Sequence, residues 1–311
     1  MNKNNIVFGT GPLGYWVMKL LAEQGNKVTL VSKSGKTKHK LPEGVEIKPA
    51  DSKNAEEVYS VCKDADAVYY CAMPPYTDWP NNFPDMIKGL IEGVARTNTK
   101  IIFGDNLYMY GSTKGKPIKE NLPYTATGHK GKTRALIANM LLEAHKEGKI
   151  KVTMGRASDF YGPEVINANF GEMFFKPALA GKTVNMIGDI TLPHTFTYIK
   201  DFAKALITLG ENDKSYGRAW HIPSAKTISQ KEMVELVEKE IGKKIKVRSA
   251  GKLMITFLGL FNPMVKEVKE MMYTMTEPYI VDHSDFENIF GANPTPHNVA
   301  IKETVEWYKN N

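Results

Sequence analysis

The chain has 311 residues, of which 42% are hydrophobic and 24% charged, so it can bury one or two full-sized cores and is not largely disordered. Its net charge of +7 comes from lysines that are spread along the chain and mixed with glutamates, which argues against a specific nucleic-acid partner. The longest apolar run, at 253–261, is about half as long as a membrane-spanning helix requires.

The cysteines and the N-terminus indicate the compartment. Cys62 and Cys71 match no zinc-binding spacing, and so few thiols are typical of a reducing environment. A strand-like stretch begins within a few residues of the start, which leaves no room for a signal peptide. We therefore expect a cytoplasmic protein without a bound metal. We also expect no membrane partner, and a protein that is a monomer or a homodimer.

In the first half of the chain, short apolar runs alternate with longer amphipathic stretches, the pattern of βαβ units and a parallel sheet. Strands are predicted at Asn5–Gly9, Lys27–Val31, Val45–Lys48, Ala67–Cys71, Lys100–Phe103 and Ile150–Gly155. Helices are predicted at Pro12–Gln24, Ala55–Cys62, Phe83–Thr97 and Thr127–Glu147. The prediction is an α/β fold, a Rossmann-type doubly wound parallel sheet, over residues 1–165.

After residue 165 the alternation loosens. Helices are predicted at Phe170–Ala180, Asp201–Leu209, Ser229–Ile241, Lys252–Phe261, Pro263–Thr276 and Val299–Tyr308. We expect residues 166–311 to complete the sheet and to form a smaller, mostly helical C-terminal substrate domain.

A glycine-rich loop follows the first predicted strand. Gly9 permits a tight turn, Gly11 lets the backbone approach a pyrophosphate, and Gly14 allows the helix to pack closely on the strand. The helix that opens at Pro12 and Leu13 would present its N-terminal amides to the anion. The loop therefore predicts a site for a nicotinamide dinucleotide.

The end of the second strand bears on the choice between NAD and NADP. An NAD site usually places a carboxylate here for the ribose hydroxyl, but no Asp or Glu occurs between Gln24 and Glu43. Ser32 and Lys33 stand in its place and suit a 2′-phosphate, although a solvated basic loop would have the same composition. We therefore predict NADP rather than NAD.

Two further groups follow predicted strands, at the edge where such sheets bind ligands. Asp51 comes after the third strand and is a candidate for the adenine edge. Cys71, Ala72 and Met73 come after the fourth and are candidates for the pyrophosphate and ribose. A structural turn is the alternative interpretation of both groups.

With these residues in place, the chain resembles the extended, atypical short-chain dehydrogenases/reductases, a superfamily that includes sugar-nucleotide epimerases and dehydratases. The resemblance covers nearly the whole length. Besides the glycine loop, it rests on Tyr110-Gly111, Lys132, Asp159–Pro163 and Thr197–Ala203. It implies a nicotinamide cofactor, with Lys132 holding its ribose.

The departures concern catalysis. In the superfamily a tyrosine lies four residues before the lysine, and a serine or threonine follows the fifth strand. Here Gly128 and Asn106 occupy those positions, and Asp105 precedes the latter. Asp105 and Asn106 either position a substrate hydroxyl or amine, or only end the strand.

Several side chains are candidates to replace the missing tyrosine. His129 shares a helix face with Lys132 and has a suitable ordinary pKa, although a surface histidine is the alternative. Tyr124 lies in the preceding loop, and the fold could also bring other phenols near the nicotinamide, namely Tyr108, Tyr161 and Tyr198. For His194 and His221, a structural role is the preferred interpretation.

Three functions are compatible with this sequence. The first is an NADP-dependent oxidoreductase that acts on a carbonyl or alcohol of a small molecule, with the cofactor carrying the hydride. The second is a sugar-nucleotide epimerase or dehydratase that uses the cofactor transiently. The third is an inactive dinucleotide-binding sensor, which the loss of the tyrosine and serine favours.

Overall fold

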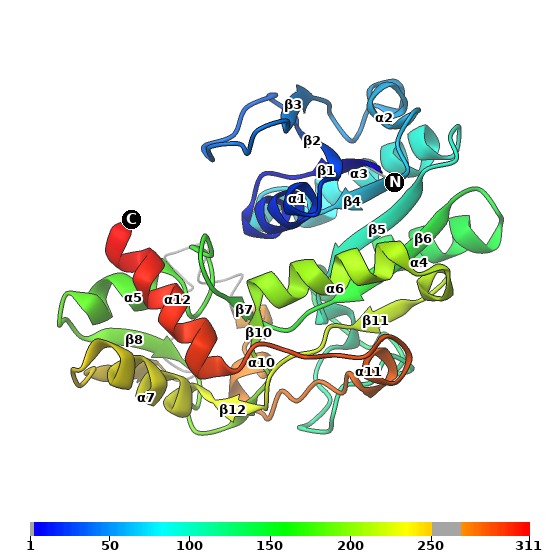
Figure 1. Cartoon of the computed structure of the whole chain (residues 1–311). Coiled ribbons are helices and arrows are strands. Elements are labelled where there is room, and N and C mark those ends of the chain that lie inside the picture. The colour runs from blue at the N-terminus through cyan, green and yellow to red at the C-terminus, as the bar shows by residue number, and fades with distance from the viewer. Residues whose placement is uncertain (1–2, 251–268) are drawn as a thin grey trace. The chain divides into compact units, whose positions relative to one another are not determined.

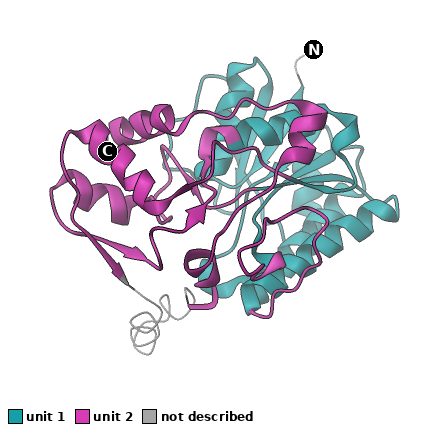
Figure 2. Cartoon of the chain, turned by 90° about the horizontal axis from the view of Figure 1, so that it is seen from below, with its two compact units in different colours: residues 1–109, 129–156, 202–220 teal, residues 110–128, 157–201, 221–311 magenta. Residues whose placement is uncertain are grey.

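The computed structural model describes residues 3–250 and 269–311, and the chain divides into two compact units (Figure 2). Unit 1 combines residues 1–109, 129–156 and 202–220, and unit 2 combines residues 110–128, 157–201 and 221–311. Each unit draws on several stretches of the chain, and the division at residue 165 stays a prediction.

Unit 1 is built on a seven-stranded sheet with the strand order β11-β6-β5-β4-β1-β2-β3 (Figure 1). The strands are β1 (Asn4–Phe8), β2 (Lys27–Ser32), β3 (Glu46–Pro49), β4 (Ala67–Tyr70), β5 (Lys100–Asp105), β6 (Lys151–Arg156) and β11 (Ala219–His221). The pairs from β3 through β6 are parallel, and the chain crosses from β3 to β4, on the far side of β1. This order confirms the predicted doubly wound fold.

Helices cover both faces of this sheet. They are α1 (Pro12–Glu23), α2 (Ala55–Cys62), α3 (Trp79–Val94), α4 (His129–Lys146) and α6 (Ile199–Glu211), with the 3-10 helices η1 (Tyr76–Asp78) and η3 (Asp213–Ser215). Leu13 of α1 and Leu206 of α6 both lie beside Gly104 of β5, whereas α3 packs against α2 and against α4. Because both faces are covered, the central strands are continuously apolar and buried.

The start of helix α3 differs from the prediction by several residues, more than the starts of α4, α5 and α6 do. Helix α3 begins at Trp79, four residues before the expected start at Phe83. Pro80 lies in its first turn, where a backbone amide has no acceptor within the helix, so this proline costs no hydrogen bond. Pro84 also lies inside the helix, which is why the sequence pattern placed the start too late.

Unit 2 consists of short strands and helices. Its strands are β7 (Phe160–Tyr161), β8 (Val184–Ile187), β9 (Pro193–His194), β10 (Thr197–Tyr198), β12 (Ile228–Ser229) and β13 (Val247–Ala250), which form three two-stranded pairs. Its helices are α5 (Glu172–Leu179), α7 (Gln230–Ile241), α10 (Tyr273–Thr276), α11 (Ser284–Phe290) and α12 (His297–Asn310), and the 3-10 helix η2 (Tyr108–Tyr110) lies at the boundary. The helix expected at 252–261 and most of the one expected at 263–276 lie outside the described residues.

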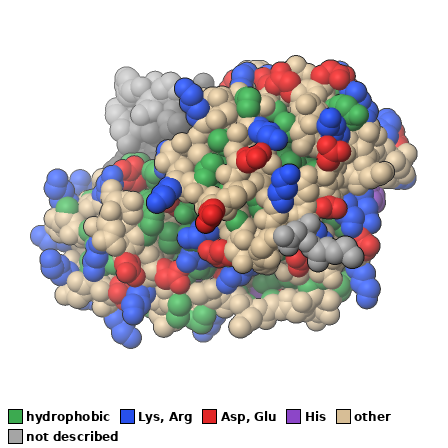
Figure 3. All heavy atoms as spheres, turned by 45° about the horizontal axis from the view of Figure 1, so that its top comes forward, with side chains coloured by type: hydrophobic (Ala, Val, Ile, Leu, Met, Phe, Trp, Pro, Cys, Tyr) green, Lys and Arg blue, Asp and Glu red, His purple; other side chains and the backbone are tan. Residues whose placement is uncertain are grey.

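Two features of the surface bear on partners. On the face shown in Figure 3, Lys and Arg are interspersed with Asp and Glu rather than gathered in a patch of one sign. Among the described helices, none has the length and apolar character needed to cross a membrane.

Candidate dinucleotide site

The glycine loop has the close backbone approaches that its sequence predicts. Gly9 has a φ of +106°, and a Cβ atom on it would lie 2.8 Å from the backbone of Cys71 after β4. A Cβ atom on Gly14 would collide with the carbonyl oxygen of Gly9. Any side chain at either position would therefore displace the loop.

Gly11 is different, because its role concerns space rather than conformation. Its φ of −73° is one that any residue adopts. A Cβ atom on Gly11 would meet no atom within 4 Å. Gly11 caps the N-terminus of α1 and Pro12 follows it, so the loop offers open space beside a helix N-terminus, which fits a pyrophosphate.

The end of β2 carries an ion pair that the sequence did not reveal. Lys33 Nζ lies 2.7 Å from Asp51 Oδ2, which raises the pKa of Lys33 and lowers that of Asp51. The hydroxyl of Ser32 donates to the carbonyl of Lys36 at 3.0 Å. Lys33 is nevertheless 80% exposed, so its ammonium group can contact a ligand phosphate.

The sequence did not indicate that His39 lies at the glycine loop. Its Nε2 atom lies 3.1 Å from the carbonyl oxygen of Thr10 in the glycine loop. Its ring lies 4.4 Å from that of Tyr15, measured between centroids. The basic segment 33–40 therefore contacts the glycine loop through His39.

The residues after β4 lie beside the same loop. The amide of Cys71 donates to the carbonyl of Phe8 at 2.8 Å, and Ala72 follows directly. Burial raises the pKa of the Cys71 thiol, so this cysteine is not a reactive thiolate at neutral pH. Met73 is 56% exposed and is free to contact a ligand.

Helix α4 buries a different lysine from the one that the resemblance indicates. Lys132 is exposed, on the side of α4 opposite its buried residues. Lys130 is 1% exposed and Arg134 is 5% exposed. The role expected for Lys132 stays a prediction, and His129 beside it is also exposed.

The end of β5 is occupied by buried ion pairs. Asp105 accepts a hydrogen bond from Arg134 and another from Arg156, each at 3.1 Å. The side-chain oxygen of Asn106 accepts from the amide of Tyr108 at 3.1 Å. Asp105 thus binds two guanidinium groups, and Asn106 also shapes the turn that follows the strand.

Of the remaining candidates, Tyr108 lies in unit 1 and the others lie in unit 2. A Cβ atom on Gly128 would collide with the carboxylate of Glu270, so this carboxylate fills the space of a side chain at position 128. The ring of Tyr124 packs edge-on against that of Tyr110. The hydroxyl of Tyr161 forms a hydrogen bond with Nδ1 of His297, and burial raises the pKa of Tyr161. Tyr198 donates to Glu303 at 2.6 Å, and burial raises its pKa as well.

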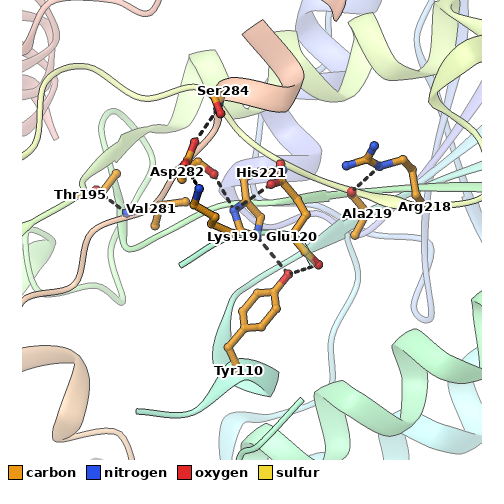
Figure 4. A network of polar contacts seen from close by, with 10 residues as sticks. All are labelled: Tyr110, Lys119, Glu120, Thr195, Arg218, Ala219, His221, Val281, Asp282 and Ser284. Atoms are coloured by element: carbon orange, nitrogen blue, oxygen red, sulfur yellow. Dashed lines mark hydrogen bonds and ion pairs between the residues drawn. The ribbon is translucent and has the colours of Figure 1, made fainter. Parts of the chain in front are cut away.

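His221 and His194 of unit 2 have neighbours that account for their burial. Figure 4 shows His221 between Tyr110, whose hydroxyl lies 3.0 Å from Nε2, and the carbonyl of Asp282, 2.8 Å from Nδ1. Glu120 accepts from the His221 amide at 3.0 Å. His194 stacks between Phe196 and Tyr279. Both arrangements agree with structural roles.

The glycine loop, the order of the strands and the open space at the start of α1 define a Rossmann-type dinucleotide-binding protein. Residues 6–222 match the model of the NAD dependent epimerase/dehydratase family, and the chain belongs to this family. No curated protein matches the sequence.

Solved structures of similar fold cover nearly the whole chain. A UDP-N-acetylglucosamine 4-epimerase from Methanobrevibacter ruminantium M1, in complex with UDP-N-acetylmuramic acid, is 21% identical over 99% of both chains, with a TM-score of 0.82. A UDP-glucuronic acid 4-epimerase from Bacillus cereus, in complex with UDP-glucuronic acid and NAD, is 19% identical over 99% of both chains (TM-score 0.80). A dTDP-glucose 4,6-dehydratase from Bacillus anthracis, in complex with NAD, is 18% identical over 99% of this chain and 97% of its own (TM-score 0.80). At these identities the similarity establishes the fold.

Proposed function

We propose that this protein is an epimerase or dehydratase that acts on a sugar nucleotide with the help of a nicotinamide dinucleotide. The observation that carries the proposal is the family match over residues 6–222, combined with a glycine loop whose geometry leaves space at Gly11. This function, which the sequence suggested as an alternative, has better support than a small-molecule carbonyl reductase.

Different residues of the chain would bind the pyrophosphate and select the cofactor. Gly9, Gly11 and Gly14 would admit the pyrophosphate to the N-terminus of α1. The bound dinucleotide would take up and return a hydride. Ser32 and Lys33 would select NADP through its 2′-phosphate, a preference supported by the missing carboxylate after β2.

A dinucleotide-binding regulator is the second candidate. Gly128 favours it, since this position, which matches the superfamily's tyrosine by its spacing from Lys132, has no side chain to donate a proton, and the carboxylate of Glu270 fills its space. Such a protein would bind the cofactor and respond to it without turnover.

The test is to incubate the purified protein with NAD or NADP and, separately, UDP-N-acetylglucosamine, UDP-glucuronic acid and dTDP-glucose. We expect chromatography with mass spectrometry to detect an epimer, or a product lighter by one water, from at least one of them. Tight dinucleotide binding without conversion of any sugar nucleotide would overturn the enzyme in favour of the regulator. Oxidation of NADPH by simple aldehydes alone would favour the carbonyl reductase.

A further inference from the structure

Helix α4 buries two cations one helical turn apart. Lys130 and Arg134 are separated by four residues and lie on the same face of the helix, which is its buried face. The superfamily's tyrosine and lysine have the same spacing on the corresponding helix. Lys132, which matches that lysine by sequence alone, lies on the exposed face.

The two cations share an aromatic environment. Lys130 Nζ lies 3.8 Å from the ring centroid of Tyr76 and 5.2 Å from that of Trp79. It also donates to the carbonyl of Tyr76 at 2.5 Å. The guanidinium carbon of Arg134 lies 4.3 Å from the centroid of Trp79, and Asp105 binds its terminal nitrogen. These contacts hold both cations in place.

Two buried donors beside Lys130 point to a ligand. Arg134 Nε and Trp79 Nε1 have no hydrogen-bond partner among the described residues. Buried N–H groups are nearly always paired, so an unpaired one often indicates a missing acceptor. Burying an ammonium group is costly, and a fold that only had to fill this space would use an apolar side chain.

The location agrees with this interpretation. Tyr76 and Trp79 follow β4, and Asp105 ends β5, so the cluster lies at the carboxyl edge of the sheet in unit 1. The glycine loop follows β1, which pairs with β4, and therefore lies at the same edge. Ligands of doubly wound sheets bind at this edge, next to the point where the strand order reverses.

We propose that the buried pair Lys130 and Arg134 replaces the tyrosine and lysine of relatives, and that the ammonium group of Lys130, rather than that of Lys132, contacts the bound dinucleotide. In this proposal a lysine ammonium group, and not a tyrosine hydroxyl, contacts the dinucleotide. The proposal rests on dinucleotide binding by this unit, and it is independent of which sugar nucleotide the protein converts.

The experiment measures dissociation constants for NADPH and NADH by fluorescence titration of four variants. Lys130→Met, which keeps the length of the side chain but not its charge, should weaken binding of the preferred dinucleotide by about 10- to 100-fold. Lys146→Met, an exposed change on the same helix, is the matched control, and Lys132→Met should resemble it. Lys130→Arg, which keeps the charge, should recover part of the affinity.

A second measurement observes the ligand response in the wild type and does not depend on the affinity of a variant. With lysine labelled at ¹³Cε, the NMR signal of Lys130 in the wild type, assigned with Lys130→Arg, should shift when dinucleotide is added, and that of Lys132 should not. Wild-type affinity in Lys130→Met, a loss confined to Lys132→Met, or an unmoved Lys130 signal would overturn the proposal. A wild type that binds neither dinucleotide would remove the proposed function as well.

Discussion

The glycine loop after β1 and the start of helix α4 lie at the same edge of one sheet, yet they are encoded differently. In the loop, backbone geometry decides the residue, since Gly9 needs its φ of +106° and Gly14 lies against a carbonyl oxygen. In α4, burial decides which of two lysines, Lys130 or Lys132, belongs to the interior. A requirement of the backbone can be recognised in a short motif, whereas the orientation of a side chain on a helix depends on what packs against it.

The largest expected effect concerns the buried ion pairs that Asp105 forms with Arg134 and Arg156. Replacing Asp105 by Asn leaves Arg134 and Arg156 buried without a counter-charge, and we expect the free energy of unfolding to fall by about 3–5 kcal/mol. The measurement is urea denaturation. Asp213→Asn is the control, because Asp213 also binds two cations, Lys100 and Lys151, but is 72% exposed. Equal losses in the two variants would contradict the importance of burial here.

In the glycine loop, a substitution of Gly11 should affect dinucleotide binding rather than the stability of the fold. Gly11→Val places a side chain in the open space beside the N-terminus of α1, and we expect it to abolish detectable dinucleotide binding while the thermal midpoint stays near that of the wild type. Gly14→Ala should instead destabilise the fold by about 1–3 kcal/mol, since its new methyl group meets a backbone carbonyl. A Gly11→Val variant that folds and binds normally would exclude this loop as the phosphate site.

A smaller effect is expected at the end of β2. Lys33→Glu removes a cation that faces solvent, breaks its contact with Asp51 and adds a negative charge. We expect the affinity for NADP to fall by about tenfold and that for NAD to change little. Parallel titrations with the two cofactors measure this, and an equal change in both would show that Lys33 does not contact the 2′-phosphate.

The smallest effect is expected at His297 in unit 2. Burial lowers the pKa of His297 in the folded state, so the unfolded chain binds protons more readily below about pH 6.5. The contribution of His297 to stability is therefore complete at neutral pH and decreases as the pH falls below that value. We expect His297→Gln to flatten the decrease in unfolding free energy between about pH 7 and pH 5. A slope in His297→Gln equal to that of the wild type would contradict this assignment.

The sequence predicted the sheet of unit 1 well, because buried parallel strands are continuous apolar runs and the helices between them have a regular period. It placed the start of α3 too late, since Pro84 resembles a helix start but lies inside the helix. It did not reveal the ion pair of Lys33 with Asp51 or the contact of the His39 ring with the Thr10 carbonyl, because these contacts join residues that are distant in the chain. The carboxylate of Glu270 beside Gly128 belongs to the same class of long-range contact.

The most direct test of the account is whether unit 1 binds a nicotinamide dinucleotide, and which one. Isothermal titration of the purified full chain with NADPH and NADH, after removal of any co-purified cofactor, measures both dissociation constants. We expect both to bind, with NADPH the tighter ligand, because Ser32 ends β2, Lys33 follows it, and no carboxylate occurs between Gln24 and Glu43. Tighter binding of NADH would contradict the assigned preference, and no binding of either would contradict the dinucleotide site itself.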